Sequence, residues 1–107
     1  MSEFKELRRQ LRIAYGTVID RARTPRWPVQ SKFASEVGLT TNTFRRIELG
    51  EREVTAPELD VIEMVLGVNP GSLRAEAWKL IQHGEIPTHA ERAAETWRRS
   101  LNPKRRT

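Results

Sequence analysis

The 107-residue sequence contains no cysteine, so disulfides, thiolate nucleophiles and cysteine-based zinc sites are all excluded. No run of ten apolar residues occurs, and we therefore expect neither a membrane span nor a secretory signal. No alternating strand pattern or internal repeat is present. A chain of this length has room for one core of ordinary size. These absences fit a small cytoplasmic protein.

The sequence offers little for catalysis or for metal binding. Its two histidines, His83 and His89, lie six positions apart and flank a predicted helix break, so they do not form the one-face pair of a helical zinc site. No nucleophile elbow and no phosphate-binding glycine loop is visible. We therefore predict that the protein is not an enzyme and that it needs no metal or other cofactor.

The charge of the chain is the first positive indication. Lysine and arginine total 19 against 14 acidic residues, which gives a net charge of +5 and an isoelectric point near 10.4. A basic domain of this size often binds nucleic acid, because neutralising phosphates releases counterions. Alternatively, a soluble protein that is simply rich in arginine would have the same composition. The bases concentrate in residues 1–53 and at the chain end, whereas residues 56–85 are acidic on balance.

The apolar residues recur every three or four positions, which predicts an all-α fold of five or six helices. The first helix is long, and Gly16 leaves open whether it is one helix or two. Thr55 with Glu58, and Thr88 with Glu91, predict capping boxes at two helix starts. Asn69-Pro70 predicts another start. The expected helices cover about 2–24, 29–38, 40–50, 55–67, 69–84 and 88–101.

Residues 30–50 form the most informative unit. A short helix ends at Gly38, and a second begins after Thr40, which stands at the N-cap position. Ala34 is small where the two helices must cross closely, and Ile47 would hold the second helix against the core. Two helices joined steeply by a short glycine-containing turn are a helix-turn-helix, whose second helix can enter a major groove.

This unit resembles the Cro/CI-type helix-turn-helix family, also called the XRE family, of phage repressors and small bacterial regulators. The resemblance covers roughly residues 16–73. It rests on several elements that occur in the family's order and close to its spacing. They are Arg23, Gln30, Ala34, Gly38, Ile47-Glu48-Leu49-Gly50 and Leu66-Gly67-Val68. Val29 stands where the family prefers a serine or threonine cap, and the turn 24–28 is unusually stiff.

The resemblance implies a lambda-repressor-like five-helix domain and a role for individual residues. Base-contacting positions would be Thr41, Asn42, Thr43 and Arg46. Thr40 and Arg23 would contact the DNA backbone, and Gln30 would touch a phosphate or the first base. Apart from the resemblance, position and charge make Arg45, Lys32 and Arg52 further candidates for backbone contacts. Ala34, Gly38, Ile47 and Glu48 would shape the motif, with Arg23 and Glu48 joined by an ion pair between the first and third helices. Residues 1–84 would form this domain with its N-terminal extension, and residues 85–107 a C-terminal helix and basic tail.

The chemistry of these side chains agrees with such roles. Asparagine can pair bidentately with adenine and arginine with guanine, and Asn42 and Arg46 share one helix face. Each assignment has a plainer alternative. The threonines can be caps and surface residues, Arg45 and Arg46 can be a solvated face, and Arg23–Glu48 can be a surface ion pair of small value.

We therefore expect a sequence-specific double-stranded DNA-binding regulator, of the phage repressor type, that acts by occupying an operator. Useful specificity needs two half-sites and hence a homodimer. The expected dimer surface lies after Gly67 and uses the C-terminal helices. Its apolar residues are Trp78, Leu80, Ile81 and Trp97. No small-molecule effector domain is expected. Two alternatives remain open: an antitoxin that gives its C-terminal helices to a toxin, and an interaction module that has lost DNA binding.

Overall fold

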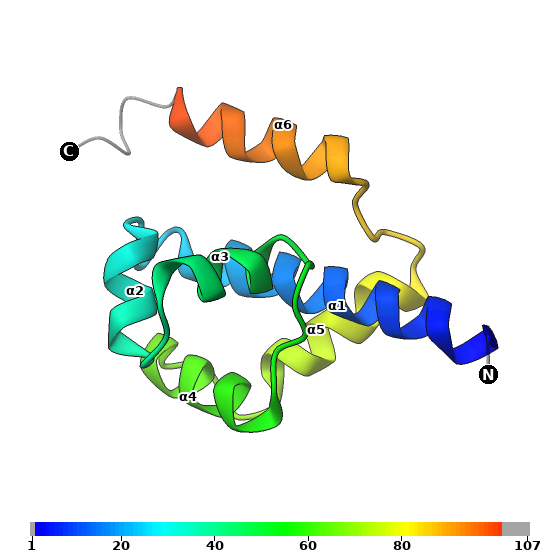
Figure 1. Ribbon diagram of the computed structural model, residues 1–107, viewed down its shortest axis with the longest axis horizontal. Helices are drawn as coiled ribbons and strands as arrows, with labels where there is room; N and C mark the ends of the chain where they lie inside the picture. Colours follow the sequence, from blue (N-terminus) through cyan, green and yellow to red (C-terminus); the bar gives the residue numbers. More distant parts are fainter. Residues whose placement is uncertain (1, 102–107) are drawn as a thin grey trace.

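The computed structural model describes residues 2–101, and it is all-helical over that range, with six α-helices and no strand (Figure 1). This confirms the predicted all-α class. The basic tail at 104–106 and the proline at 103 lie outside the described residues. The helices are α1 (Ser2–Arg23), α2 (Gln30–Glu36), α3 (Thr41–Glu48), α4 (Ala56–Leu66), α5 (Ser72–Gln82) and α6 (His89–Ser100).

Helix α1 is continuous through Gly16, so the alternative of two helices is wrong. A Cβ at Gly16 would lie 2.3 Å from the carbonyl oxygen of Ile47 and 2.6 Å from that of Glu48. Glycine is therefore required by packing, since the last turn of α3 lies directly against the α1 backbone. The cost of glycine inside a helix is offset by this close approach.

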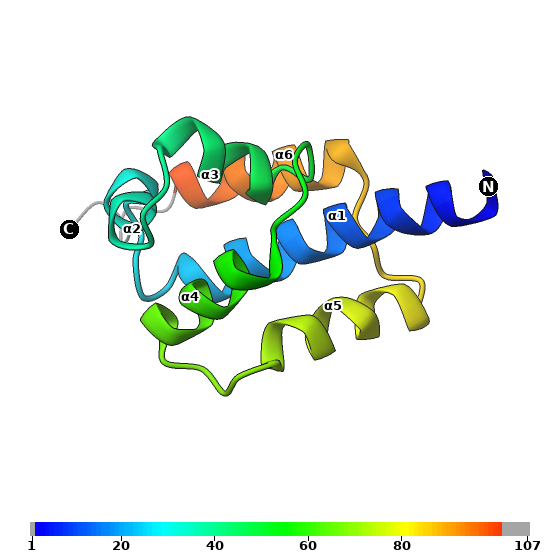
Figure 2. The ribbon, with the colours of Figure 1, turned by 60° about the horizontal axis from the view of Figure 1, so that its bottom comes forward.

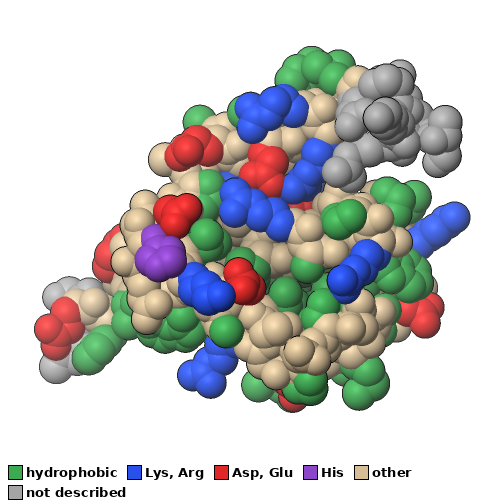
Figure 3. All heavy atoms as spheres, turned by 180° about the vertical axis from the view of Figure 1, so that it is seen from behind, with side chains coloured by type: hydrophobic (Ala, Val, Ile, Leu, Met, Phe, Trp, Pro, Cys, Tyr) green, Lys and Arg blue, Asp and Glu red, His purple; other side chains and the backbone are tan. Residues whose placement is uncertain are grey.

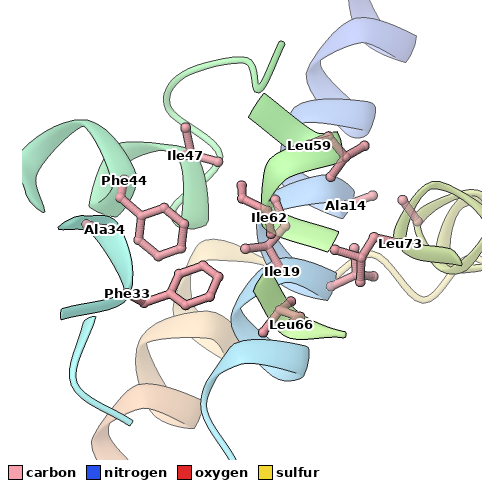
Figure 4. Packing of buried hydrophobic residues seen from close by; sticks show 12 residues of the cluster. Ala14, Ile19, Phe33, Ala34, Phe44, Ile47, Leu59, Ile62, Leu66 and Leu73 are labelled. Carbon is pink, nitrogen blue, oxygen red and sulfur yellow. The ribbon is translucent and has the colours of Figure 1, made fainter. Parts of the chain in front are cut away.

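The hydrophobic core lies between α1, α2, α3, α4 and α5 (Figure 4). Phe33 from α2 and Phe44 from α3 are fully buried, with ring centroids 5.3 Å apart. Trp27 packs edge-on against Phe33 at 5.5 Å, so its ring serves the core. The buried apolar residues are Ala14, Val18, Ile19, Phe33, Ala34, Phe44, Ile47, Leu59, Ile62, Leu66, Leu73 and Ala77. None of them comes from α6.

Three predicted helix starts are confirmed and one is wrong. Thr40 caps α3, and both capping boxes, Thr55 with Glu58 and Thr88 with Glu91, are present. Asn69-Pro70, however, lies before α5, which begins at Ser72 after a glycine with a φ of +86°. The reason is tertiary. The buried carboxylate of Glu63 accepts the backbone N–H groups of Gly71 and Leu73, both at 2.9 Å, and so caps α5 from α4.

Helix α6 folds back along α1 and the end of α3 (Figures 1 and 2). Its side toward the body is polar. Arg92 is buried, and Glu95 and Arg99 are half-buried. Its apolar residues face the other way, with Trp97 64% and Leu101 55% exposed. The usual arrangement of an amphipathic surface helix is therefore reversed in α6.

Candidate nucleic-acid interface

The turn between α2 and α3 sets the direction of α3. Gly38, with a φ of +80°, ends α2 in the left-handed conformation that favours glycine. The Leu39 N–H then donates to the carbonyl of Ala34 at 2.9 Å. The side-chain oxygen of Thr40 accepts the N–H of Thr43 at 3.1 Å and starts the next helix. With Ala34 fully buried at the crossing, α3 is held firmly and its outer face is left to solvent.

That outer face is polar and partly basic. Thr41, Asn42, Arg45 and Arg46 are exposed, whereas Thr43 is half-buried and bonded to the cap. Arg45 Nη2 donates to Asn42 Oδ1 at 2.7 Å. Arg46 lies 3.9 Å from Glu51, a loose and exposed pair. No described segment covers these four exposed side chains, so the surface that would have to meet a ligand is accessible.

Behind this face, Arg23 and Glu48 form a buried ion pair. Arg23 Nε lies 2.7 Å from Glu48 Oε2, and both residues are at most 5% exposed. The Arg23 guanidinium also donates to the carbonyl of Trp27, at 2.7 Å. The alternative of a surface ion pair is therefore wrong. The assignment of Arg23 to a DNA phosphate is also wrong, because its guanidinium is buried and donates to groups within the fold. The pair locks the end of α1 to the end of α3.

The other side chains predicted to contact the DNA backbone differ in whether they already bond to groups of the protein. Lys32 on α2 is exposed. Gln30 is half-buried and donates to Glu48 Oε1 at 2.7 Å. Arg52 forms a two-pronged contact with Glu58, at 2.9 and 3.0 Å, which cancels its charge and leaves it half-buried. Thr40 is exposed but serves as a helix cap. Lys32 and Arg45 are thus the cations best placed for an outside phosphate.

Sequence reasoning missed the most heavily bonded carboxylate in the described chain, Asp20. It is 4% exposed, and its oxygens accept from Arg92 at 2.8 Å and from Arg99 at 2.8 Å. Arg23 reaches it at 3.3 Å. Arg92 also donates to the backbone carbonyl of Glu48 at 3.0 Å, so it joins α6 to α3 directly. The spacing of charges on α6 at 92, 95 and 99 was the available signal, since it marks one helix face.

The pKa values of the buried carboxylates Glu48 and Asp20 are shifted in opposite directions. Burial raises the pKa of Glu48 above its ordinary value, and the contacts from Arg23 and Gln30 offset this only in part. Burial acts on Asp20 in the same sense, but hydrogen bonds from Arg99 and Arg92 outweigh it, and the pKa of Asp20 is lowered. Asp20 is therefore held as the anion that the arginines of α6 require.

Two clefts separate α6 from the body. One, of about 480 Å³, opens beside the α2–α3 unit and is lined by Gln30, Arg45 and Arg99 among others. The other, of about 740 Å³, lies between α1 and the start of α6. Within residues 2–101 no three histidine, cysteine or acidic side chains gather as metal ligands. Figure 3 shows blue and red side chains alternating along the seam below α6.

Comparisons with protein-family models, with curated proteins and with solved structures find no match to this chain. Over the described residues, no helix has both the length and the apolar character that crossing a bilayer demands. Any functional assignment therefore depends on the geometry and chemistry of the α2–α3 unit and of the helices around it.

Proposed function

We propose that the protein is a sequence-specific, double-stranded DNA-binding regulator of the Cro/CI helix-turn-helix type, in which α3 enters the major groove. It would act as a repressor by occupying an operator. The observation that carries the proposal is the exposed face of α3, held from behind by the buried Arg23–Glu48 pair. A helix fixed at its core side and open on its polar side is what groove readout requires.

Each side chain on this face has a proposed part. Arg46 and Asn42 lie four positions apart and read base edges, with arginine suited to guanine and asparagine to adenine. Thr41 packs its methyl group on a thymine methyl. Arg45 and Lys32 bind phosphates on either side. Thr43 is half-buried and hydrogen-bonded to the cap, so we assign it to positioning the start of α3 and give it a smaller share of base contact.

The test compares Arg46→Ala with Arg74→Ala, which removes another exposed arginine, on α5. Binding is measured on the preferred duplex and on duplexes changed at one base pair. Arg46→Ala should weaken binding by about 1–3 kcal/mol and erase the preference at one position. Arg74→Ala should leave that preference intact. Equal loss on every duplex for Arg46→Ala would assign it to the backbone, and no binding by the wild type would reject the proposal.

The antitoxin hypothesis uses the same face of α3 and gives α6 to a toxin. The observation in its favour is the outward apolar stripe on α6, with Trp97 and Leu101 largely exposed. Its mark would be a stable complex with the product of a neighbouring small reading frame. The hypothesis of an interaction module without DNA binding is disfavoured by the exposed arginines of α3.

A further inference from the structure

The outward face of α6 carries an apolar stripe at the spacing of a coiled coil. Ala90, Ala94, Trp97 and Leu101 follow one another at intervals of four, three and four residues, which is the a/d repeat. Leu101 retains right-handed helical geometry at the C-cap. Arg92 and Arg99 point toward Asp20 and lie on the opposite side of the helix. Docking α6 on the body therefore directs this stripe outward, and Figure 3 shows hydrophobic side chains along the outer edge of α6.

We propose that this stripe pairs with the same stripe of a second copy of the chain, antiparallel, about a two-fold axis between residues 95 and 96. In this register Ala94 of each chain faces Trp97 of the other, and Ala90 faces Leu101. Every layer then sets a small side chain against a large one, as close packing of a helix pair requires. A parallel pair would instead place Trp97 against itself and Ala94 against itself.

The charges beside the stripe favour the same arrangement. Glu91 and Arg98 lie on one flank of the stripe, seven residues apart, and both are exposed. A two-fold axis perpendicular to the helices brings like flanks together. Glu91 of one chain therefore meets Arg98 of the other, and the pair occurs twice. Glu91 keeps one oxygen for the cap, where it accepts the Thr88 N–H at 3.0 Å, and its second oxygen remains available.

The partner of this surface is thus a second copy, because the stripe is complementary to itself in both size and charge. One helix pair of this length is small beside ordinary stable interfaces of about 1,200–2,000 Å². The dimer should therefore be weak in solution and strengthened on DNA that carries two half-sites, where the second binding event becomes intramolecular. The inference deepens the proposed function by naming the partner surface, and it stands or falls separately from DNA reading.

The first test measures mass by sedimentation of the full chain over a wide concentration range. The wild type should rise from 12.4 kDa toward twice that mass. Ala94→Glu places a carboxylate at the centre of the stripe and should stay monomeric. Ala75→Glu, the same change at an exposed site on α5, should behave as the wild type. A wild type that stays monomeric at every concentration, or equal behaviour of the two variants, would overturn the proposal.

The second test uses charge to fix the register. Arg98→Glu sets two carboxylates against each other in the homodimer, and Glu91→Arg sets two arginines. Each variant alone should associate less than the wild type. Mixed in equal amounts they restore both pairs, so heterodimers should form. Circular dichroism of Glu91→Arg checks that α6 persists without its capping box. Mixing that restores no association would exclude the antiparallel register.

A third measurement separates this inference from the proposed function. Ala94→Glu should bind a duplex with one half-site as the wild type does. On a duplex with two half-sites it should need roughly tenfold more protein for half-saturation, because the linked second event is lost. Unchanged binding on both duplexes would reject the dimer and leave DNA reading intact. Loss on the single half-site would contradict the separation of the two surfaces.

Discussion

Arg92 of α6 reaches Asp20 of α1 across 72 residues of chain, with Nη1 2.8 Å from Oδ2 and both side chains at most 8% exposed. The same guanidinium donates to the backbone carbonyl of Glu48 at the end of α3. Since no described residue of α6 belongs to the hydrophobic core, these polar contacts hold the last helix in place. The orientation of α6, and with it the outward stripe, depends on these contacts and on the Arg21–Glu95 pair. Their most heavily bonded member is the buried carboxylate of Asp20.

Replacing that carboxylate should release α6. Asp20→Asn removes the buried anion that Arg92 and Arg99 share and leaves Arg92 only the longer contact to Glu95, at 3.5 Å. Breaking a buried ion pair typically costs about 3–5 kcal/mol where the structure cannot adjust. Because α6 can move away into water, we expect a smaller loss in unfolding free energy together with fast amide exchange confined to α6. Glu53→Gln, which breaks the exposed Arg8–Glu53 pair, should change stability by less than about 1 kcal/mol. Retained protection of α6 in Asp20→Asn would contradict the account.

Gly16 should tolerate no side chain. A methyl group there would lie within 3 Å of backbone atoms of Ile47 and Glu48, and backbone cannot move aside as a flexible side chain does. We expect Gly16→Ala to destabilise the fold by about 1–3 kcal/mol, although the same change in an open helix would stabilise it. Urea unfolding measures this. Lys5→Ala at an exposed position of α1 serves as control, and a gain in stability for Gly16→Ala would refute the close contact.

Acid should weaken the attachment of α6. The pKa of Asp20 is lowered in the folded chain, so its stabilising contribution is full above the unfolded value of about 4 and is lost as pH falls through the folded value. Glu48, with a raised pKa, acts in the opposite sense and offsets part of this loss. The protection factors of the α6 amides, which already account for the intrinsic pH dependence of exchange, should fall between pH 5 and pH 2. In Asp20→Asn this fall should be smaller, because Glu95, whose pKa is lowered by arginine contacts that outweigh its burial, is then the carboxylate that still holds α6.

The salt dependence of DNA binding should identify the phosphate contacts. Arg45→Ala and Lys32→Ala remove exposed cations on and beside the face of α3 that is proposed to enter the DNA groove. Each should reduce the slope of log affinity against log salt by about 0.9. Arg52→Ala should change the slope less, because Glu58 already neutralises that guanidinium. Titrations between 50 and 300 mM salt measure the slopes. Slopes equal to that of the wild type for Arg45→Ala and Lys32→Ala would remove these two residues from the interface.

Local signals allowed most of the helices to be predicted from the sequence. Thr40, Thr55 and Thr88 cap helices through bonds to residues three positions away, and Gly38 ends α2, so short segments specify these boundaries. The predicted start of α5 was wrong because the cap of this helix comes from Glu63 on another helix. Such a bond leaves no mark in the neighbouring sequence.

The candidate site shows the same difference between features set by nearby residues and features set by distant ones. The exposed face of α3 follows from helical spacing, and the Arg23–Glu48 pair was expected from a family pattern. The burial of that pair was not, and it removed Arg23 from the set of phosphate contacts. Leu80 and Ile81, expected at a dimer surface, pack instead on the core. The role of Asp20 was missed because its partners lie 72 and 79 residues away.

Selection of bound duplexes from a random pool tests the central claim, that α3 reads DNA, most directly. The wild type should enrich a defined consensus, and Asn42→Ala with Arg46→Ala should lose that consensus while keeping the fold by circular dichroism. If α6 pairs as proposed, the consensus should contain two inverted half-sites. A pool that shows no enrichment, or an unchanged consensus in the double variant, would contradict the account.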